Sequence, residues 1–200
     1  MGKVVAIVGN SGAGKSTLTR RLCEAGAFAS GLEEHEERPY QRHFAAGSNS
    51  FALPNQIDYL LLRAEQERKI RQGKRTGLVD GGLEMDYFVF TRRFYARGYL
   101  DEAGFQLCSR LYGLIRELLP PPDLFIWLCV SAEIAAARRK SRSRELDIVT
   151  PEDLADLEEY LQEWLGGYTA APVLKIDASR EDPTFSALLP ELLTRLKRLE

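Results

Sequence analysis

The chain has 200 residues, of which 44% are hydrophobic and 28% are charged, values that are typical of a globular protein and argue against disorder. Its 27 Lys and Arg residues nearly balance its 29 Asp and Glu residues, which argues against a general nucleic-acid-binding protein, since such proteins are basic. The length predicts one α/β domain covering residues 1–200.

Three cysteines, Cys23, Cys108 and Cys129, are widely spaced and form no C-x-x-C motif, so we expect neither a disulfide framework nor a zinc site. This pattern fits a reducing, cytoplasmic setting. The longest strongly apolar run, residues 124–130, is too short to span a bilayer, and the apolar run at residues 4–8 is too short for a signal peptide. We therefore expect no membrane partner.

Short apolar runs alternate with segments of helical periodicity along the chain, which predicts a parallel sheet wrapped by helices. Residues 33–55 show neither pattern and are predicted as a loop with short helical turns. The elements predicted in the first part of the chain are, in order, a strand at 4–8, a helix at 16–23, a weaker strand at 27–32, a helix at 56–72 and a strand at 78–80.

Capping residues and prolines mark the elements of the second part. Asp101 and Thr150 are placed to cap helices, and Pro190 predicts that the last helix is either kinked there or begins later. The predicted elements are helices at 86–97 and 102–119, a strand at 124–130, a helix from 131 into an Arg-rich segment, a helix at 151–165, a strand at 173–176 and a helix from about 184. The fold class is therefore α/β, with a five-stranded parallel sheet and helices on both faces.

The sequence GNSGAGKS at residues 9–16 fits G-x-x-x-x-G-K-[ST], the P-loop motif, and lies between a predicted strand and a predicted helix as that motif requires. Glycines let backbone N–H groups converge on a phosphate, and the helix N-terminus adds partial positive charge. Lys15 can reach the β- and γ-phosphates of ATP, and the Ser16 hydroxyl can bind Mg²⁺. The residues predicted to bind ATP are Gly9, Asn10, Ser11, Gly12, Ala13, Gly14, Lys15, Ser16 and Thr17.

Two carboxylates follow predicted strands and are candidates for the chemistry. Asp80 ends the strand at 78–80, where it can hold Mg²⁺ together with Ser16, although a turn Asp before two glycines is the alternative. Glu33 follows the strand at 27–32 and can act as a general base, although it also opens an acidic run that can be a solvated surface. A GTPase is not indicated, since the guanine-reading N-K-x-D motif is absent.

An Arg-rich segment predicts a lid at about residues 138–147. Arg138 and Arg142 are i,i+4 neighbours on a helix, and such a segment can close over ATP and stabilise the transferred phosphoryl group. The alternative is a solvated helix end that complements its own dipole. Gln56 and Arg63 share one helix face and can read the edge of a base, with ordinary surface polarity as the alternative.

Together these residues resemble the deoxynucleoside kinase family, especially its small bacterial deoxyadenosine and deoxyguanosine kinases. The stretch EEHEERPY at 33–40 is similar to the family's segment with the catalytic glutamate, which implies that Glu33 is the base. The stretch FALPNQI at 51–57 is similar to its base-binding segment. Further roles implied by the resemblance are base contact for Phe51, Gln56, Arg63 and Asp86, a sugar 3′-hydroxyl contact for Asp147, Mg²⁺ binding for Asp80, and lid catalysis for Arg138, Arg142 and Arg144.

The chain departs from the family pattern at three positions. Gly81 stands where the D-R-S motif has an Arg, Ala45 stands where a Tyr shares the sugar hydroxyl, and Glu34 replaces the Pro after the catalytic glutamate.

The prediction is an ATP- and Mg²⁺-dependent kinase that phosphorylates the 5′-hydroxyl of a deoxynucleoside for nucleotide salvage, with a purine deoxynucleoside favoured. The alternatives are a nucleoside monophosphate kinase of the thymidylate type and a regulatory P-loop protein that binds ATP without catalysis. The resemblance also implies a homodimer, or a heterodimer with a related kinase subunit, and no nucleic-acid polymer as partner.

Overall fold

A computed structural model describes residues 1–31, 38–140, 150, 153–179, 182 and 184–199. Five parallel strands form one sheet, as predicted, and their order in it is β2-β3-β1-β4-β5. The apolar runs form strands because their side chains are buried on both faces of a parallel sheet, and β1 and most of β4 are inaccessible to solvent. The strands are β1 Val4–Gly9, β2 Ala29–Gly31, β3 Gly77–Asp80, β4 Leu124–Cys129 and β5 Val173–Asp177.

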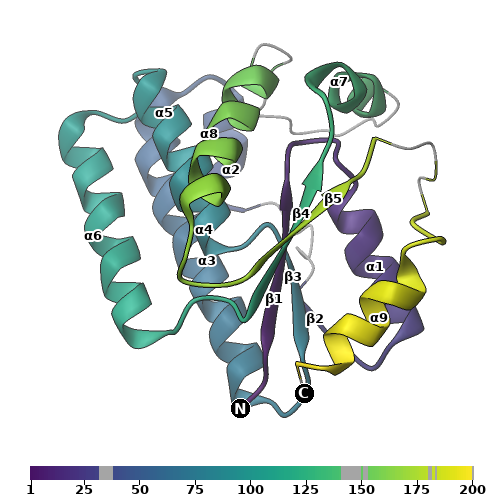
Figure 1. Cartoon of the computed structure of the whole chain (residues 1–200). Coiled ribbons are helices and arrows are strands. Elements are labelled where there is room, and N and C mark those ends of the chain that lie inside the picture. The colour runs from purple at the N-terminus through teal and green to yellow at the C-terminus, as the bar shows by residue number, and fades with distance from the viewer. Residues whose placement is uncertain (32–37, 141–149, 151–152, 180–181, 183, 200) are drawn as a thin grey trace.

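Helices cover both faces of this sheet (Figure 1). On one face lie α1 and α9, and on the other lie α3, α6 and α8, with α7 above the carboxyl ends of the strands. The longer helices are α1 Lys15–Ala25, α3 Ala52–Gln72, α6 Glu102–Leu118, α7 Ala132–Lys140, α8 Asp153–Gly167 and α9 Leu189–Lys197. The shorter ones are α2 Gln41–Ala45, the 3₁₀ turn η1 Asn49–Phe51, α4 Leu83–Met85, the π-helical η2 Asp86–Thr91 and α5 Arg92–Ala96.

Short helical turns were predicted within the loop at residues 33–55, and α2 and η1 confirm them, but the prediction is wrong in its last part, because α3 begins at Ala52. The apolar periodicity starts only at Ile57, so the first turn of α3 left no pattern to detect. Pro54 lies in that first turn, where its missing N–H costs no intrahelical hydrogen bond. Of the region predicted as loop, residues 33–37 lie outside the described part.

Other boundaries differ in smaller ways. The helix predicted at 86–97 begins at Leu83 and contains the π-helical turn η2. Of the two alternatives at the C-terminus, the later start is confirmed, since α9 begins at Leu189 with Pro190 in its first turn. Asp101 caps α6 as predicted, accepting a bond of 2.7 Å from the N–H of Gly104.

The hydrophobic interior has two parts. The larger surrounds the sheet, and a smaller one lies among α3, α5 and α6, where Leu60, Phe94 and Cys108 are almost inaccessible to solvent. This second core fixes the helices that carry the predicted base-site residues relative to the sheet. None of the helices in the described ranges is long and apolar enough to cross a membrane, and the three cysteines are free thiols.

Candidate active site

The P-loop connects β1 to α1 in a backbone conformation that its glycines permit. Gly12 and Gly14 have φ angles of 91° and 100°, which L side chains rarely adopt. A Cβ atom on Gly12 would also lie 2.5 Å from the carbonyl oxygen of Ala135 in α7, so the loop and α7 are in direct contact. The Lys15 ammonium donates hydrogen bonds to the carbonyl oxygens of Gly9 (2.9 Å) and Asn10 (3.0 Å), which holds the cation at the loop.

Asp80 lies beside the P-loop. The Ser16 hydroxyl, in the first turn of α1, donates a hydrogen bond to the Oδ2 atom of Asp80 at the end of β3. The register of β1 and β3, with Ile7 opposite Asp80, produces this contact, because it brings the carboxyl ends of both strands to one edge. A hydroxyl and a carboxylate are oxygen ligands of the kind that Mg²⁺ prefers, so this pair fits the predicted metal site.

The turn after β3 explains why the family's Arg is absent. Gly81 and Gly82 have φ angles of 88° and 98°, and with a ψ of 173° Gly82 occupies a region that is essentially restricted to glycine. A Cβ atom on Gly81 would lie 3.5 Å from the Nη2 atom of Arg63. A side chain at position 81 would therefore begin in van der Waals contact with another guanidinium group.

Arg63 and Asp86 form a buried ion pair close to this turn. The Nε atom of Arg63 donates to Oδ2 of Asp86 at 2.7 Å, and the two side chains are only 6% and 10% exposed. The Nη1 atom of Arg63 donates to Oε1 of Gln66 at 3.2 Å. Asp86 therefore faces a fixed cation, which favours the ionised form of a carboxyl group in a buried position.

Gln56 is buried on the same helix, α3, seven residues before Arg63, and its side chain is hydrogen-bonded to the π-helical turn η2. Its amide nitrogen donates to the carbonyl oxygen of Asp86 (2.8 Å) and to the hydroxyl of Thr91 (2.9 Å). Phe51 lies at the start of the same helix, half-buried, and its ring stacks on His43 with 4.7 Å between centroids. The structure thus brings Gln56, Arg63 and Asp86 together, with Phe51 in η1, directly before α3.

The two ends of the predicted lid are anchored near the P-loop. Its N-terminal side is α7, in contact with Gly12 and carrying the partly buried Arg138. Its C-terminal side is α8, where the carbonyl oxygen of Leu154 accepts a hydrogen bond of 2.8 Å from the Asn10 side chain. The predicted site residues Glu33, Arg142, Arg144 and Asp147 lie outside the described residues.

Two anchoring contacts were missed by the sequence analysis. The Asn10 side chain, predicted only as part of the nucleotide loop, is fully buried and turned toward α8. Arg93 of α5 forms a buried ion pair with Asp153 at the start of α8. Burial alone would raise the pKa of Asp153, but the bonds from Arg93 and from the Thr150 N–H outweigh it and lower that pKa. No local pattern marks these pairs, because their partners are far apart in the sequence.

A buried charged triad under the base-site turn was also missed. Arg116 of α6 donates two hydrogen bonds to Glu67 of α3, at 2.8 and 2.9 Å, and its Nε atom lies 2.7 Å from Oε1 of Glu84. Both carboxylates are almost inaccessible to solvent. Burial raises the pKa of Glu84 to about 8, while Arg116 opposes this rise. One cation shared by two carboxyl groups is neutralised when one of the two is protonated, which favours a protonated Glu84 below that pH.

The site combines a P-loop, a carboxylate at the end of a strand, and a helical segment rich in arginine above them. This combination defines a P-loop phosphotransferase. Comparison with known proteins narrows this class. The family model for deoxynucleoside kinase matches residues 5–197, and the chain belongs to the deoxynucleoside kinase family. The predicted enzyme class and family are confirmed, and neither alternative, the thymidylate-type kinase or the non-catalytic regulator, is supported.

Relatives in sequence and structure agree with this assignment. The chain is 25% identical over 176 residues to a deoxyadenosine/deoxycytidine kinase of Bacillus subtilis, covering 86% of this chain and 81% of that protein. It is 29% identical over 180 residues to a deoxyadenosine kinase of Dictyostelium discoideum, covering 89% and 73%. A deoxyadenosine kinase from M. mycoides, solved with dCMP and dCDP, has the same fold, with a TM-score of 0.81, 22% identity, and coverage of 98% of this chain and 99% of that one.

Proposed function

We propose that this chain transfers the γ-phosphoryl group of ATP to the 5′-hydroxyl of a purine deoxynucleoside, deoxyadenosine or deoxyguanosine, and so supplies the monophosphate for nucleotide salvage. One observation carries the proposal: the Ser16–Asp80 contact and the Arg63–Asp86 pair meet at the Gly81 turn, at one edge of the sheet. A phosphate site and a site for a polar base edge are thereby placed next to each other.

In the proposed mechanism, the P-loop amides and Lys15 hold the phosphates of ATP. Lys15 reaches them by exchanging its bonds to the loop carbonyls for bonds to phosphate oxygens, because an ammonium is a mobile point charge on a flexible stem. Ser16 and Asp80 would hold Mg²⁺, which when bound neutralises charge on the phosphate oxygens. The deoxynucleoside lies beyond Asp80, against the Arg63–Asp86 pair.

The remaining steps rest on the family resemblance. Glu33 accepts the proton of the 5′-hydroxyl, Asp147 binds the sugar 3′-hydroxyl, and the lid at about 138–147 closes within the single domain of residues 1–200. Arg138, Arg142 and Arg144 then stabilise the charge on the transferred phosphoryl group. The anchoring of α7 and α8 at the P-loop supports this role, since it keeps both ends of the lid segment close to the phosphates.

The base preference follows from the chemistry of the Arg63–Asp86 pair. An ionised carboxylate accepts hydrogen bonds and donates none, so Asp86 favours an exocyclic amino group or a ring N–H and repels a carbonyl oxygen. Thymidine presents two carbonyls at its base edge and is expected to be the poorest substrate. Gln56 can pair with either purine only if its amide nitrogen exchanges its bonds to the Asp86 carbonyl and the Thr91 hydroxyl for a bond to the base, because these two bonds engage both of its N–H donors.

The test is the steady-state kcat/KM of the four deoxynucleosides with ATP and Mg²⁺, measured by coupled ADP release. We expect deoxyadenosine or deoxyguanosine to be first, deoxycytidine weaker and thymidine last. Thymidine in first place would contradict the role of Asp86. Absence of turnover with all four would contradict the proposed reaction.

We also propose a homodimer joined through α6. Leu107, Leu114 and Leu118 are 45%, 55% and 74% exposed, and with Leu111 they are spaced 4, 3 and 4 residues apart, the spacing of helices that pack side by side. Figure 1 shows α6 as the outermost helix of its layer. Light scattering of L114R/L118R is expected to report a monomer. A25R places one such arginine at the end of α1, on the opposite face of the sheet, and should leave the dimer intact.

Finally, we propose that the chain works in the cytoplasm, as the cysteine pattern indicates. Its free thiols at residues 23, 108 and 129 support this location, because they suit a reducing compartment.

A further inference from the structure

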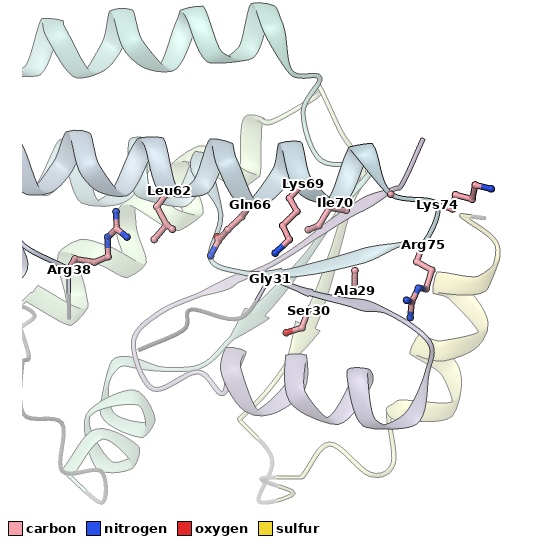
Figure 2. A pocket seen from close by; sticks show the side chains of 11 residues that line it. Ala29, Ser30, Gly31, Arg38, Leu62, Gln66, Lys69, Ile70, Lys74 and Arg75 are labelled. Carbon is pink, nitrogen blue, oxygen red and sulfur yellow. The ribbon is translucent and has the colours of Figure 1, made fainter. Parts of the chain in front are cut away.

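A groove separate from the P-loop runs between the edge strand β2 and the C-terminal half of α3 (Figure 2). Its volume is about 460 Å³, within the range of small-molecule sites. One wall is apolar, formed by Leu62 and Ile70 of α3, and β2 supplies the opposite side. Arg38 lies at one end, and Lys74 and Arg75 lie at the other, where α3 leads into β3.

The charge of this groove is positive. Lys69 projects from α3 toward β2, whereas Lys74 turns outward at the helix end (Figure 2). Arg38 is neutralised by Asp58, whose Oδ2 atom accepts a bond of 2.7 Å from Nε. Among the described residues, no carboxylate lines the groove and none pairs with Lys69 or Arg75. Uncompensated cations around a partly apolar cavity favour an organic anion.

Gln66 connects the groove to the base site. Its Oε1 atom accepts the 3.2 Å bond from Arg63, which in turn holds Asp86. The amide nitrogen of Gln66 points into the groove, toward β2 (Figure 2). An anion that accepts a hydrogen bond from this nitrogen would hold Oε1 toward Arg63 and so stabilise the Arg63–Asp86 pair in its present orientation.

We propose that the groove between β2 and α3 binds a small phosphate-bearing anion, and that Gln66 transmits its binding to the Arg63–Asp86 pair. Phosphate oxygens suit this lining, because they can accept a charge-assisted hydrogen bond from Lys69 and a further bond from the Gln66 amide, while Arg75 adds positive charge at the far end of the groove. The effect on the base site rests on the proposed function. Binding in the groove does not.

The binding test is an NMR titration of the full chain with its P-loop first saturated with AMP-PNP and Mg²⁺. The probes are inorganic phosphate and phenyl phosphate, which share the anion but differ in apolar surface. Saturable shifts are expected for the amides of Ser30, Gly31, Gln66 and Lys69. Tighter binding of phenyl phosphate would indicate an organic phosphate as occupant, and equal affinities would indicate inorganic phosphate.

Variants separate the groove from general surface charge. K69Q/R75Q is expected to weaken binding by about tenfold or more. The control R68Q/R110Q removes the same charge from exposed positions outside the groove, and its affinity should stay within about twofold of the wild type. Lack of saturable shifts, or equal losses in both variants, would overturn the proposal. If only the variant E34Q/E36Q/E37Q bound the probe, the groove cations would be partners of the chain's own acidic run, and this result would also overturn the proposal.

The coupling test compares KM and kcat for the best deoxynucleoside with and without saturating phenyl phosphate. A fall in KM of about threefold, with kcat little changed, is expected because the anion orders the base-site pair and not the reacting atoms. Q66L should still bind the probe through the cations but lose the KM response. An unchanged KM in the wild type would overturn the coupling, whereas an enzyme without turnover would contradict the proposed function and leave the binding result standing.

Discussion

Restoring the family's Arg at Gly81 is expected to damage this enzyme. The φ of 88° at Gly81 costs a residue with a side chain about 1–2 kcal/mol. For a chain of this size that cost corresponds to a fall in Tm of roughly 2–8 °C. The variant G81A measures this backbone cost alone, because Ala adds only a Cβ atom.

G81R adds a second cost at the site. The new side chain would start 3.5 Å from the guanidinium of Arg63, whose carboxylate partner, Asp86, is already engaged. Two cations in a partly buried position repel each other, so we expect kcat/KM for deoxyadenosine to fall about tenfold or more beyond the effect of G81A. Coupled ADP release and urea unfolding, performed on the same preparations, measure the two costs separately.

Two glycines elsewhere provide matched controls. Gly98 also has a positive φ, 70°, but a Cβ atom added there would meet no other atom within 4 Å, so G98A should lose similar stability and keep full activity. Gly113, in the interior of α6, should gain stability as Ala, by about 0.5–1 kcal/mol. A G81R enzyme more active than the wild type would refute this reasoning, since it would mean that the space beside Gly81 is open to an Arg.

Four further outcomes are expected. K15A should lose at least about 100-fold in kcat with an unchanged Tm in a thermal melt, because Lys15 supplies charge and not packing. E33Q should lose about 10²–10⁴-fold in kcat with a nearly constant KM, and a loss below threefold would return Glu33 to the solvated acidic run. D86N should narrow the kcat/KM gap between deoxyadenosine and thymidine, because its amide can also donate to a carbonyl. Burial raises the pKa of Glu84 to about 8 from an ordinary 4.5, so between these pH values the folded protein keeps a proton that the unfolded chain has lost. The free energy of unfolding should therefore fall as pH rises from about 4.5 to 8. Urea titrations of E84Q over this pH range should show a flatter profile.

The strand–loop–helix structure around the P-loop could be predicted because its signal is local. Residues 9–16 are contiguous, the glycines and Lys15 act through backbone geometry and charge within that segment, and the flanking strand and helix are equally visible in the sequence. The central strands β1, β3 and β4 follow for the same reason, since an apolar run is what a strand buried on both faces requires, whereas the edge strands β2 and β5 are partly exposed. Likewise, the cap of α6, Asp101, and the proline in the first turn of α9, Pro190, act on the nearest turn, so their effects appear in the sequence itself.

The pairing of side chains from distant segments was decided only by the tertiary structure. The strand register brings Asp80 to Ser16, and the packing of α3 against η2 brings Arg63 to Asp86. The sequence showed that these residue types were present, but their separation in the chain contains no information about distance. The start of α3 was missed because its first turn has no apolar periodicity and is formed by packing against the second core.

The burial of individual side chains was also decided only by the tertiary structure. In the sequence, Glu84 is an ordinary acidic residue, and only its enclosure beside Arg116 gives it a raised pKa. In the sequence, Gly81 stands where the family pattern has an Arg. The structure shows that this position lies in a turn that favours glycine, next to the guanidinium group of Arg63. In each case the sequence determines which chemical group is available, and the fold determines its neighbours and its access to water, which set how that group behaves.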